Sequence, residues 1–138
     1  MKKLLFVLMT VVFFCACRKR VETPDYSALI VGKWVATSYQ KDDSDTIVKG
    51  RAYSLSYFYE YGWDFSTNKQ IRYKNGGGWS LESEKDTYLL VENKTLTLNH
   101  EDGNGDVSVS NFKIIDFTKD KLTVHSDLWK RTFFLVRE

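Results

Sequence analysis

An alternating pattern of side chains constrains the fold of this chain more than any other feature of its sequence. Over residues 53–65 every odd position carries a large apolar or aromatic residue, whereas the even positions are mostly polar. Successive side chains of a β-strand point to opposite faces, so this spacing predicts strand structure with one aromatic face. At ~3.3 Å per residue one straight strand would exceed about 40 Å, so we expect a bend or break, most readily at Gly62.

One short helix and a series of short strands are predicted for the rest of the chain. Asp25 can accept hydrogen bonds from the first turn of a helix over residues 26–31, and Gly32 can end that helix. Alternating segments bounded by turn residues then predict strands at 32–39, 70–74, 79–82, 87–91, 95–99, 107–117, 121–126 and 130–137.

The order of these elements predicts an all-β fold, an up-and-down antiparallel β-barrel of about eight strands with the helix closing one end. The strands follow one another with close turns and without a long crossing connection, and closure of the sheet removes exposed edges. Between Val109 and Phe112 the apolar phase shifts, which predicts a bulge or bend near Ser110 and Asn111. Residues 25–138 are long enough for one such domain.

Residues 1–16 predict an export signal that precedes the domain. Lys2 and Lys3 are followed by an uncharged apolar run over residues 4–16. At ~1.5 Å per helical residue, this run is too short to cross a hydrocarbon core of about 30 Å. We therefore expect residues 1–16 to be removed by processing.

The end of this signal resembles the lipobox of bacterial lipoproteins. Ala16 supplies a small residue before Cys17, and the resemblance implies that Cys17 is acylated and becomes the mature N-terminus. Cys15 is the weaker candidate because bulky Phe14 precedes it. Residues 17–24 then form the acylated cysteine and a tether, which attaches the domain to a membrane of the cell envelope. Plain secretion with cleavage near Ala16 is the alternative.

The net charge of the mature chain limits which partners it can attract. Removal of Lys2 and Lys3 with the signal reduces the 20 basic residues to 18, equal to the 18 acidic ones. A neutral domain has no general attraction for nucleic acid. The basic residues 18–20 beside the anchor can touch anionic lipid. Because some surface-displayed lipoproteins carry acidic residues at this point, we expect a periplasm-facing position, most simply at the outer membrane.

A short motif suggests the kind of barrel. Gly32, Lys33 and Trp34, placed after a capped helix and before serial strands, resemble the Gly-x-Trp signature that opens the first strand of lipocalins. The later strands look like bacterial lipocalin-like lipoprotein domains over almost the whole mature chain. The resemblance implies that an arginine of the last strand packs on Trp34, with Arg137 as the best match and Arg131 as the fallback, in a structural role.

The aromatic stripe is the candidate ligand site. An eight-stranded barrel can be filled by its own side chains or hold one small ligand. The residues that we expect to line a cup for a small, largely apolar molecule are Tyr57, Tyr59, Tyr61 and Trp63. Packing of the same stripe as ordinary core is the alternative. The alternative function is a protein-interaction module, such as an envelope assembly subunit or an inhibitor of a foreign hydrolase, that uses the loops at 41–48 and 100–106.

Outside the aromatic stripe, the sequence shows no pattern typical of a metal site or of catalytic residues. Residues 102–106 match the first oxygen spacing of a calcium loop, but Val107 and Lys113 stand where the loop needs glycine and glutamate, so a plain hairpin turn is expected. His100 and His125 are expected at the surface, and residues 82–86 are expected to form a solvated acidic face. With Cys15 removed and Cys17 acylated no thiol remains for a disulfide, a cysteine nucleophile or a thiolate metal ligand. Because the sequence also shows no nucleophile, base or metal signature, we expect neither an enzyme nor a cofactor or metal.

Overall fold

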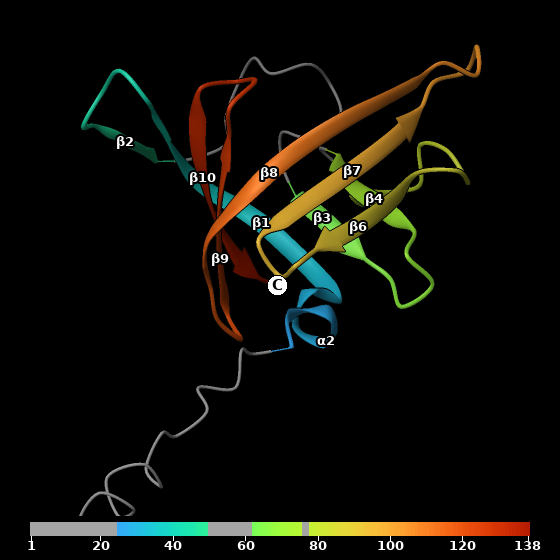
Figure 1. The fold of residues 1–138 in the computed structure, drawn as a ribbon, viewed down its shortest axis with the longest axis horizontal. Helices are drawn as coiled ribbons and strands as arrows, with labels where there is room; N and C mark the ends of the chain where they lie inside the picture. Colours follow the sequence, from blue (N-terminus) through green and yellow to red (C-terminus); the bar gives the residue numbers. More distant parts are fainter. Residues whose placement is uncertain (1–24, 50–61, 76–77) are drawn as a thin grey trace, which may run out of the picture.

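The computed structural model describes residues 25–49, 62–75 and 78–138, which form one small helix and a strongly curved sheet (Figure 1). The elements are α2 (Tyr26–Ile30), β1 (Gly32–Lys41), β2 (Ile47–Lys49), β3 (Gly62–Phe65), β4 (Ile71–Asn75), β5 (Gly78–Ser80), β6 (Thr87–Val91), β7 (Thr95–Glu101), β8 (Val107–Phe117), β9 (Lys121–Ser126) and β10 (Arg131–Arg137). The predicted signal, the lipid attachment site Cys17, the tether and Tyr57, Tyr59 and Tyr61 lie outside the described residues.

The helix begins and ends close to its predicted limits. The Asp25 carboxylate accepts a hydrogen bond from the backbone N–H of Ser27 at 2.9 Å, which satisfies one free donor of the first turn. Hydrogen bonds from the Ser27 hydroxyl and then from this N–H lower the pKa of Asp25. The chain leaves the helix through Gly32, whose φ of +124° lies in a region that side chains rarely adopt.

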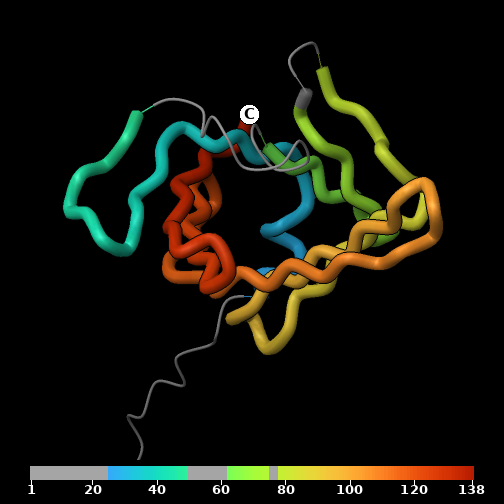
Figure 2. The backbone as a smooth tube through the Cα atoms, turned by 90° about the horizontal axis from the view of Figure 1, so that it is seen from above, coloured from blue at the N-terminus to red at the C-terminus, as the bar shows by residue number. Residues whose placement is uncertain are grey.

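The sheet is an antiparallel meander. Its strands lie in the order β5, β4, β3, β1, β10, β9, β8, β7 and β6. The short strand β2 pairs with the later part of β1, beyond the residues that pair with β3. Figure 2 shows how this sheet curls around a central axis. Its two ends meet at one antiparallel bridge between Gln70 and Thr87, where Ile71 N–H donates to the Asp86 carbonyl at 3.2 Å and Tyr88 N–H donates to the Lys69 carbonyl at 2.9 Å.

The predicted fold class is confirmed with two minor differences. The described residues contain ten strands rather than about eight, and the sheet is not closed by a continuous ladder. Two of the ten, β2 and β5, have only three residues each. β5 pairs with the end of β4, and the bridge to Thr87 of β6 lies just before the start of β4, at Gln70. The barrel wall therefore passes from β4 to β6, and the eight longer strands make up this wall.

The bulge of β8 does not lie near Ser110 and Asn111, where it was predicted. The inward side of β8 runs without a break through Ser110 and Phe112, and the register shift lies later, between Ile114 and Asp116. The prediction failed because Val109 was read as an inward residue, whereas its side chain is exposed on the outer face. A second irregularity lies in β1, between Ala36 and Ser38.

Gly62 begins β3, at the position where a break in the long alternating segment was expected. A Cβ atom at Gly62 would lie 2.2 Å from the carbonyl oxygen of Trp34, so the two strands approach too closely for any side chain there.

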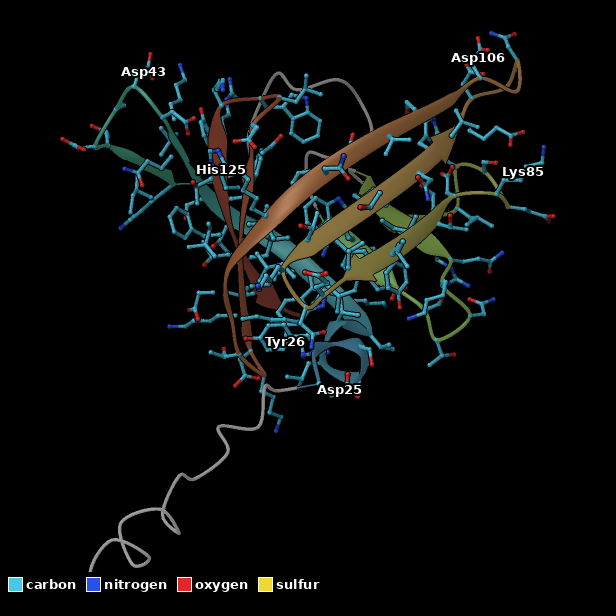
Figure 3. The ribbon with its side chains drawn as sticks, viewed as in Figure 1. Asp25, Tyr26, Asp43, Lys85, Asp106 and His125 are labelled. Atoms are coloured by element: carbon cyan, nitrogen blue, oxygen red, sulfur yellow. The ribbon has the colours of Figure 1, made fainter. Side chains whose placement is uncertain are left out.

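The core fills the barrel from the helix end upward. Its buried side chains are Ile30, Trp34, Ala36, Trp63, Phe65, Ile71, Tyr73, Tyr88, Leu96, Leu98, Phe112, Phe117, Leu122, Val124, Phe133 and Leu135. Asp25 and Tyr26 mark the helix end in Figure 3, and the turns that carry Asp43 and Asp106 mark the opposite end, which we call the mouth.

Candidate functional site

Trp34 and Arg137 hold the helix end of the barrel together. The guanidinium carbon of Arg137 lies 4.3 Å from the ring centroid of Trp34, as the lipocalin resemblance implied. Arg137 Nη1 donates to the Val31 carbonyl at 2.8 Å, and Nη2 donates to the carbonyl of Leu29. The indole N–H of Trp34 donates to the Ile30 carbonyl at 2.8 Å. The last strand and the first strand thus satisfy carbonyl groups at the helix C-terminus.

Gly32 completes this cluster by its size. A Cβ atom there would lie 2.6 Å from Arg137 Nη1, so glycine leaves the space in which the guanidinium sits. Gly32, Trp34 and Arg137 therefore have a structural role. The fallback residue, Arg131, lies at the mouth, with its guanidinium carbon 5.0 Å from the ring centroid of Tyr39.

A chain of aromatic rings leads from the core to the mouth. Trp63, the predicted site residue that the structure describes, is 2% exposed, and its ring centroid is 5.0 Å from that of Phe112. Phe112 in turn lies 5.3 Å from Trp129, and Trp129 lies 5.9 Å from Phe133. Trp63 is thus a member of the core. Its indole N–H is buried and finds no hydrogen-bond acceptor among the described residues.

A hollow of about 330 Å³ lies at the mouth beside Trp129. Its walls are Lys41, Asp42, Asp43, Trp129, Lys130 and Arg131. The backbone N–H of Trp129 donates to Ser126 Oγ at 3.3 Å, which holds the loop between β9 and β10 against the barrel. A second hollow, of about 280 Å³, lies outside the barrel near the helix and includes Tyr26 and Phe117 in its wall.

The register of β1 and β10 places the mouth hollow directly above the aromatic core. Tyr39 pairs with Phe133, and two residues further along the same face Lys41 pairs with Arg131. Cross-strand partners share a face, so these two cations continue the inner face on which Phe133 is buried. The wall therefore changes from aromatic to cationic as it leaves the core.

Sequence reasoning did not assign this site. Lys41 was named only as the start of a loop, and Arg131 only as a possible partner of Trp34. The parity of β10 was the available signal, because Arg131 lies two and four residues before the inward residues Phe133 and Leu135.

His125 lies between two acidic side chains, Asp42 and Asp127, next to the hollow. Its Nδ1 lies 3.1 Å from Thr132 Oγ1 and 3.6 Å from a carboxylate oxygen of Asp42, and its Nε2 lies 3.2 Å from Asp127. Asp127 also pairs with Lys113 at 2.8 Å, and hydrogen bonding from Lys113 is the main cause that lowers the pKa of Asp127. Figure 3 shows His125 on the same side of the molecule as Asp43.

The prediction that His100 lies at the surface is wrong, as is the solvated face for Asp86. His100 is 7% exposed and Asp86 is fully buried, with 2.9 Å between His100 Nδ1 and Asp86 Oδ1. The same oxygen accepts the backbone N–H of Glu101 at 3.1 Å. The loop before β6 folds inward here because its carboxylate finds both donors at the end of β7.

Residues 102–106 form the expected hairpin turn. Asp102 accepts backbone N–H groups from Asn104 at 2.9 Å and Asp106 at 3.0 Å, and these bonds lower the pKa of Asp102. Its carboxylate thus accepts hydrogen bonds within the turn.

Within the described ranges, no three His, Cys, Asp or Glu side chains are grouped so that they could hold a metal ion. No helix of these ranges is long and apolar enough to cross a membrane.

Solved structures share this fold. A lipocalin-like protein from Bacteroides uniformis ATCC 8492 matches with a TM-score of 0.51 and 14% identity, over 80% of this chain and 99% of that chain. An uncharacterized protein from Bacteroides eggerthii DSM 20697 matches with a TM-score of 0.50 and 15% identity, over 78% of this chain and 98% of that chain. No protein-family model matches the sequence, and curated proteins show no match. The domain is therefore a lipocalin-like β-barrel.

Proposed function

We propose that this protein is a lipid-anchored lipocalin-like lipoprotein of the bacterial cell envelope that binds a small, largely apolar molecule at the mouth of its barrel. The observation that carries the ligand site is the hollow of about 330 Å³ beside Trp129, whose ring continues into the aromatic core through Phe112 and Phe133. A ligand there can place apolar surface against an indole ring while part of it stays in contact with water.

Buried side chains fill the barrel toward its helix end and leave no room for a ligand among the described core residues. Phe112 is fully buried and Phe133 is 5% exposed, so the described core leaves the mouth as the place for a bound molecule. Tyr57, Tyr59 and Tyr61 remain predicted ligand residues.

Ligand binding at the mouth is tested by two substitutions in one loop. We expect Trp129→Ala to weaken the binding of a fluorescent apolar probe about tenfold, because Trp129 is the aromatic residue that lines the hollow. Leu128→Ala is the matched control, since the neighbouring Leu128 side chain is 73% exposed. Equal probe affinity in both variants and the unaltered protein would refute the mouth as the binding site.

The membrane anchor rests on the lipobox resemblance of residues 14–17. Metabolic labelling with a radioactive fatty acid in a bacterial host should label the protein, and Cys17→Ser should abolish the label. A mature protein that begins near residue 17 without acyl mass would favour plain secretion.

Protein interaction is the second candidate, and exposed apolar side chains at the start of β2 and in the turn before β10 favour it. Ile47 is 51% exposed and Leu128 is 73% exposed. Native mass spectrometry of the protein purified from its own cells separates the two functions. A retained small molecule supports the binding barrel, and a stoichiometric protein partner supports the interaction module.

A further inference from the structure

Two like charges face each other across neighbouring strands at the mouth. Lys41 of β1 and Arg131 of β10 are register partners on the inner face of the barrel, and both border the hollow. Like charges directly opposite each other in an antiparallel pair are destabilising. A protein tolerates such a pair most easily when an anion lies between the two cations.

Arg131 carries a donor without an acceptor. Its guanidinium lies over the Tyr39 ring, and its Nη1 atom is buried with no hydrogen-bond partner among the described residues. Buried polar atoms usually have partners, and this Nη1 donor is not used by any described residue, so it can serve an acceptor bound in the hollow. The planar guanidinium fits the paired oxygens of a carboxylate or a phosphate.

Lys130 adds a third cation at the same hollow. Lys130 adopts a φ of +53°, which is uncommon for a residue with a side chain, and it also borders the hollow. Three cationic residues therefore converge on one hollow from the end of β1 and the start of β10.

Two carboxylates border the same hollow and reduce its positive charge. Asp42 also faces the His125 ring, with 3.6 Å between its oxygen and Nδ1, and its backbone N–H donates to the Lys130 carbonyl at 3.1 Å. Asp43 lies at the turn beyond it (Figure 3). With three cations against two carboxylates, the hollow keeps a net positive charge next to an indole ring.

We infer that the mouth hollow recognises an anionic amphiphile, whose carboxylate or phosphate group binds Arg131 and Lys41 while its apolar part packs on Trp129. This inference rests on the proposed function, because it names the ligand class of the same site. The aromatic wall selects apolar surface, and the cations select the charge.

Three water-soluble probes with one ring system test the inference. They are 2-naphthylacetate, the neutral 2-naphthylacetamide and 2-naphthyl phosphate, titrated into the full mature protein in nanodiscs of zwitterionic lipid, with empty nanodiscs as the blank. We expect the acetate to bind at least about tenfold more tightly than the amide, given the strength of charge-assisted hydrogen bonds. The phosphate arm shows which anionic group the site prefers.

Substitutions show where the preference arises. Arg131→Gln and Lys41→Gln should each reduce acetate affinity at least fivefold and leave amide affinity unchanged. Lys121→Gln is the matched control, since this exposed lysine begins β9 at the helix end. Lys41→Gln keeps the test valid if loss of Arg131 disturbs folding, because the Lys41 side chain is exposed.

The outcomes separate the two proposals. Equal binding of acetate and amide, or a preference for acetate that survives both substitutions, overturns the anionic ligand and leaves a binding barrel. Failure of all three probes to bind overturns the ligand site at the mouth together with the anionic ligand.

Discussion

Replacing Arg137 with methionine tests whether one side chain joins the last strand to the helix end of the barrel. Methionine keeps the apolar stem and removes the charged donors. The substitution deletes the bond from Nη1 to the Val31 carbonyl, the bond from Nη2 to the Leu29 carbonyl and the bond from Nε to the Lys119 carbonyl at 2.7 Å. It also removes the cation from the face of Trp34.

The expected loss is about 3–4 kcal/mol in the free energy of unfolding. A hydrogen bond from a charged donor contributes about 1.5–3 kcal/mol, and a cation over an indole ring contributes about 1 kcal/mol. Because these interactions share one half-buried side chain, they are not additive, and the total stays below their sum. A loss of this size is a large fraction of the about 5–15 kcal/mol by which most domains are stable.

Urea unfolding followed by tryptophan fluorescence measures the loss. Arg72→Met is the matched control, because Arg72 is exposed on β4 and should change the free energy of unfolding by less than about 0.5 kcal/mol. If Arg137→Met and Arg72→Met unfold at the same urea concentration with the same slope, the role assigned to the Arg137 cluster is refuted.

Further predictions address other parts of the barrel. Gly32→Ala should cost about 2 kcal/mol or more in urea unfolding, since its φ is +124° and its Cβ would lie 2.6 Å from a guanidinium nitrogen; an unchanged midpoint would contradict this. Asp86→Ala should cost about 3 kcal/mol, because its buried histidine partner loses an acceptor, whereas exposed Glu84→Ala in the same loop should cost little. An NMR titration should give Asp102 a pKa below its ordinary value; since folding depresses this pKa, its contribution to stability is present above the unfolded pKa and is lost as the pH falls through the folded pKa. Tyr59→Ala should weaken uptake of an apolar probe more than it lowers the melting temperature, and an equal fall in both would assign that ring to the core.

The sequence was sufficient for the class of fold because strands and turns depend on near neighbours. Alternation at every second residue and turns at Gly, Asn and Asp predicted a series of antiparallel strands. The helix cap at Asp25 is also a local feature, and the structure confirms it. The pairing of Trp34 with Arg137 is a long-range contact, which only the resemblance to the lipocalin motif indicated.

Tertiary structure alone decided which distant side chains share a place. The bulge in β8 lies between Ile114 and Asp116. The sequence pattern misplaced it because an apolar residue such as Val109 can face solvent on the outer wall, and periodicity does not show which face is buried. Asp86 is buried because β7 offers it two donors, and a composition of charged loop residues cannot show this. The convergence of Lys41 with Arg131 follows from the register between the first and last strands, which local propensity does not encode.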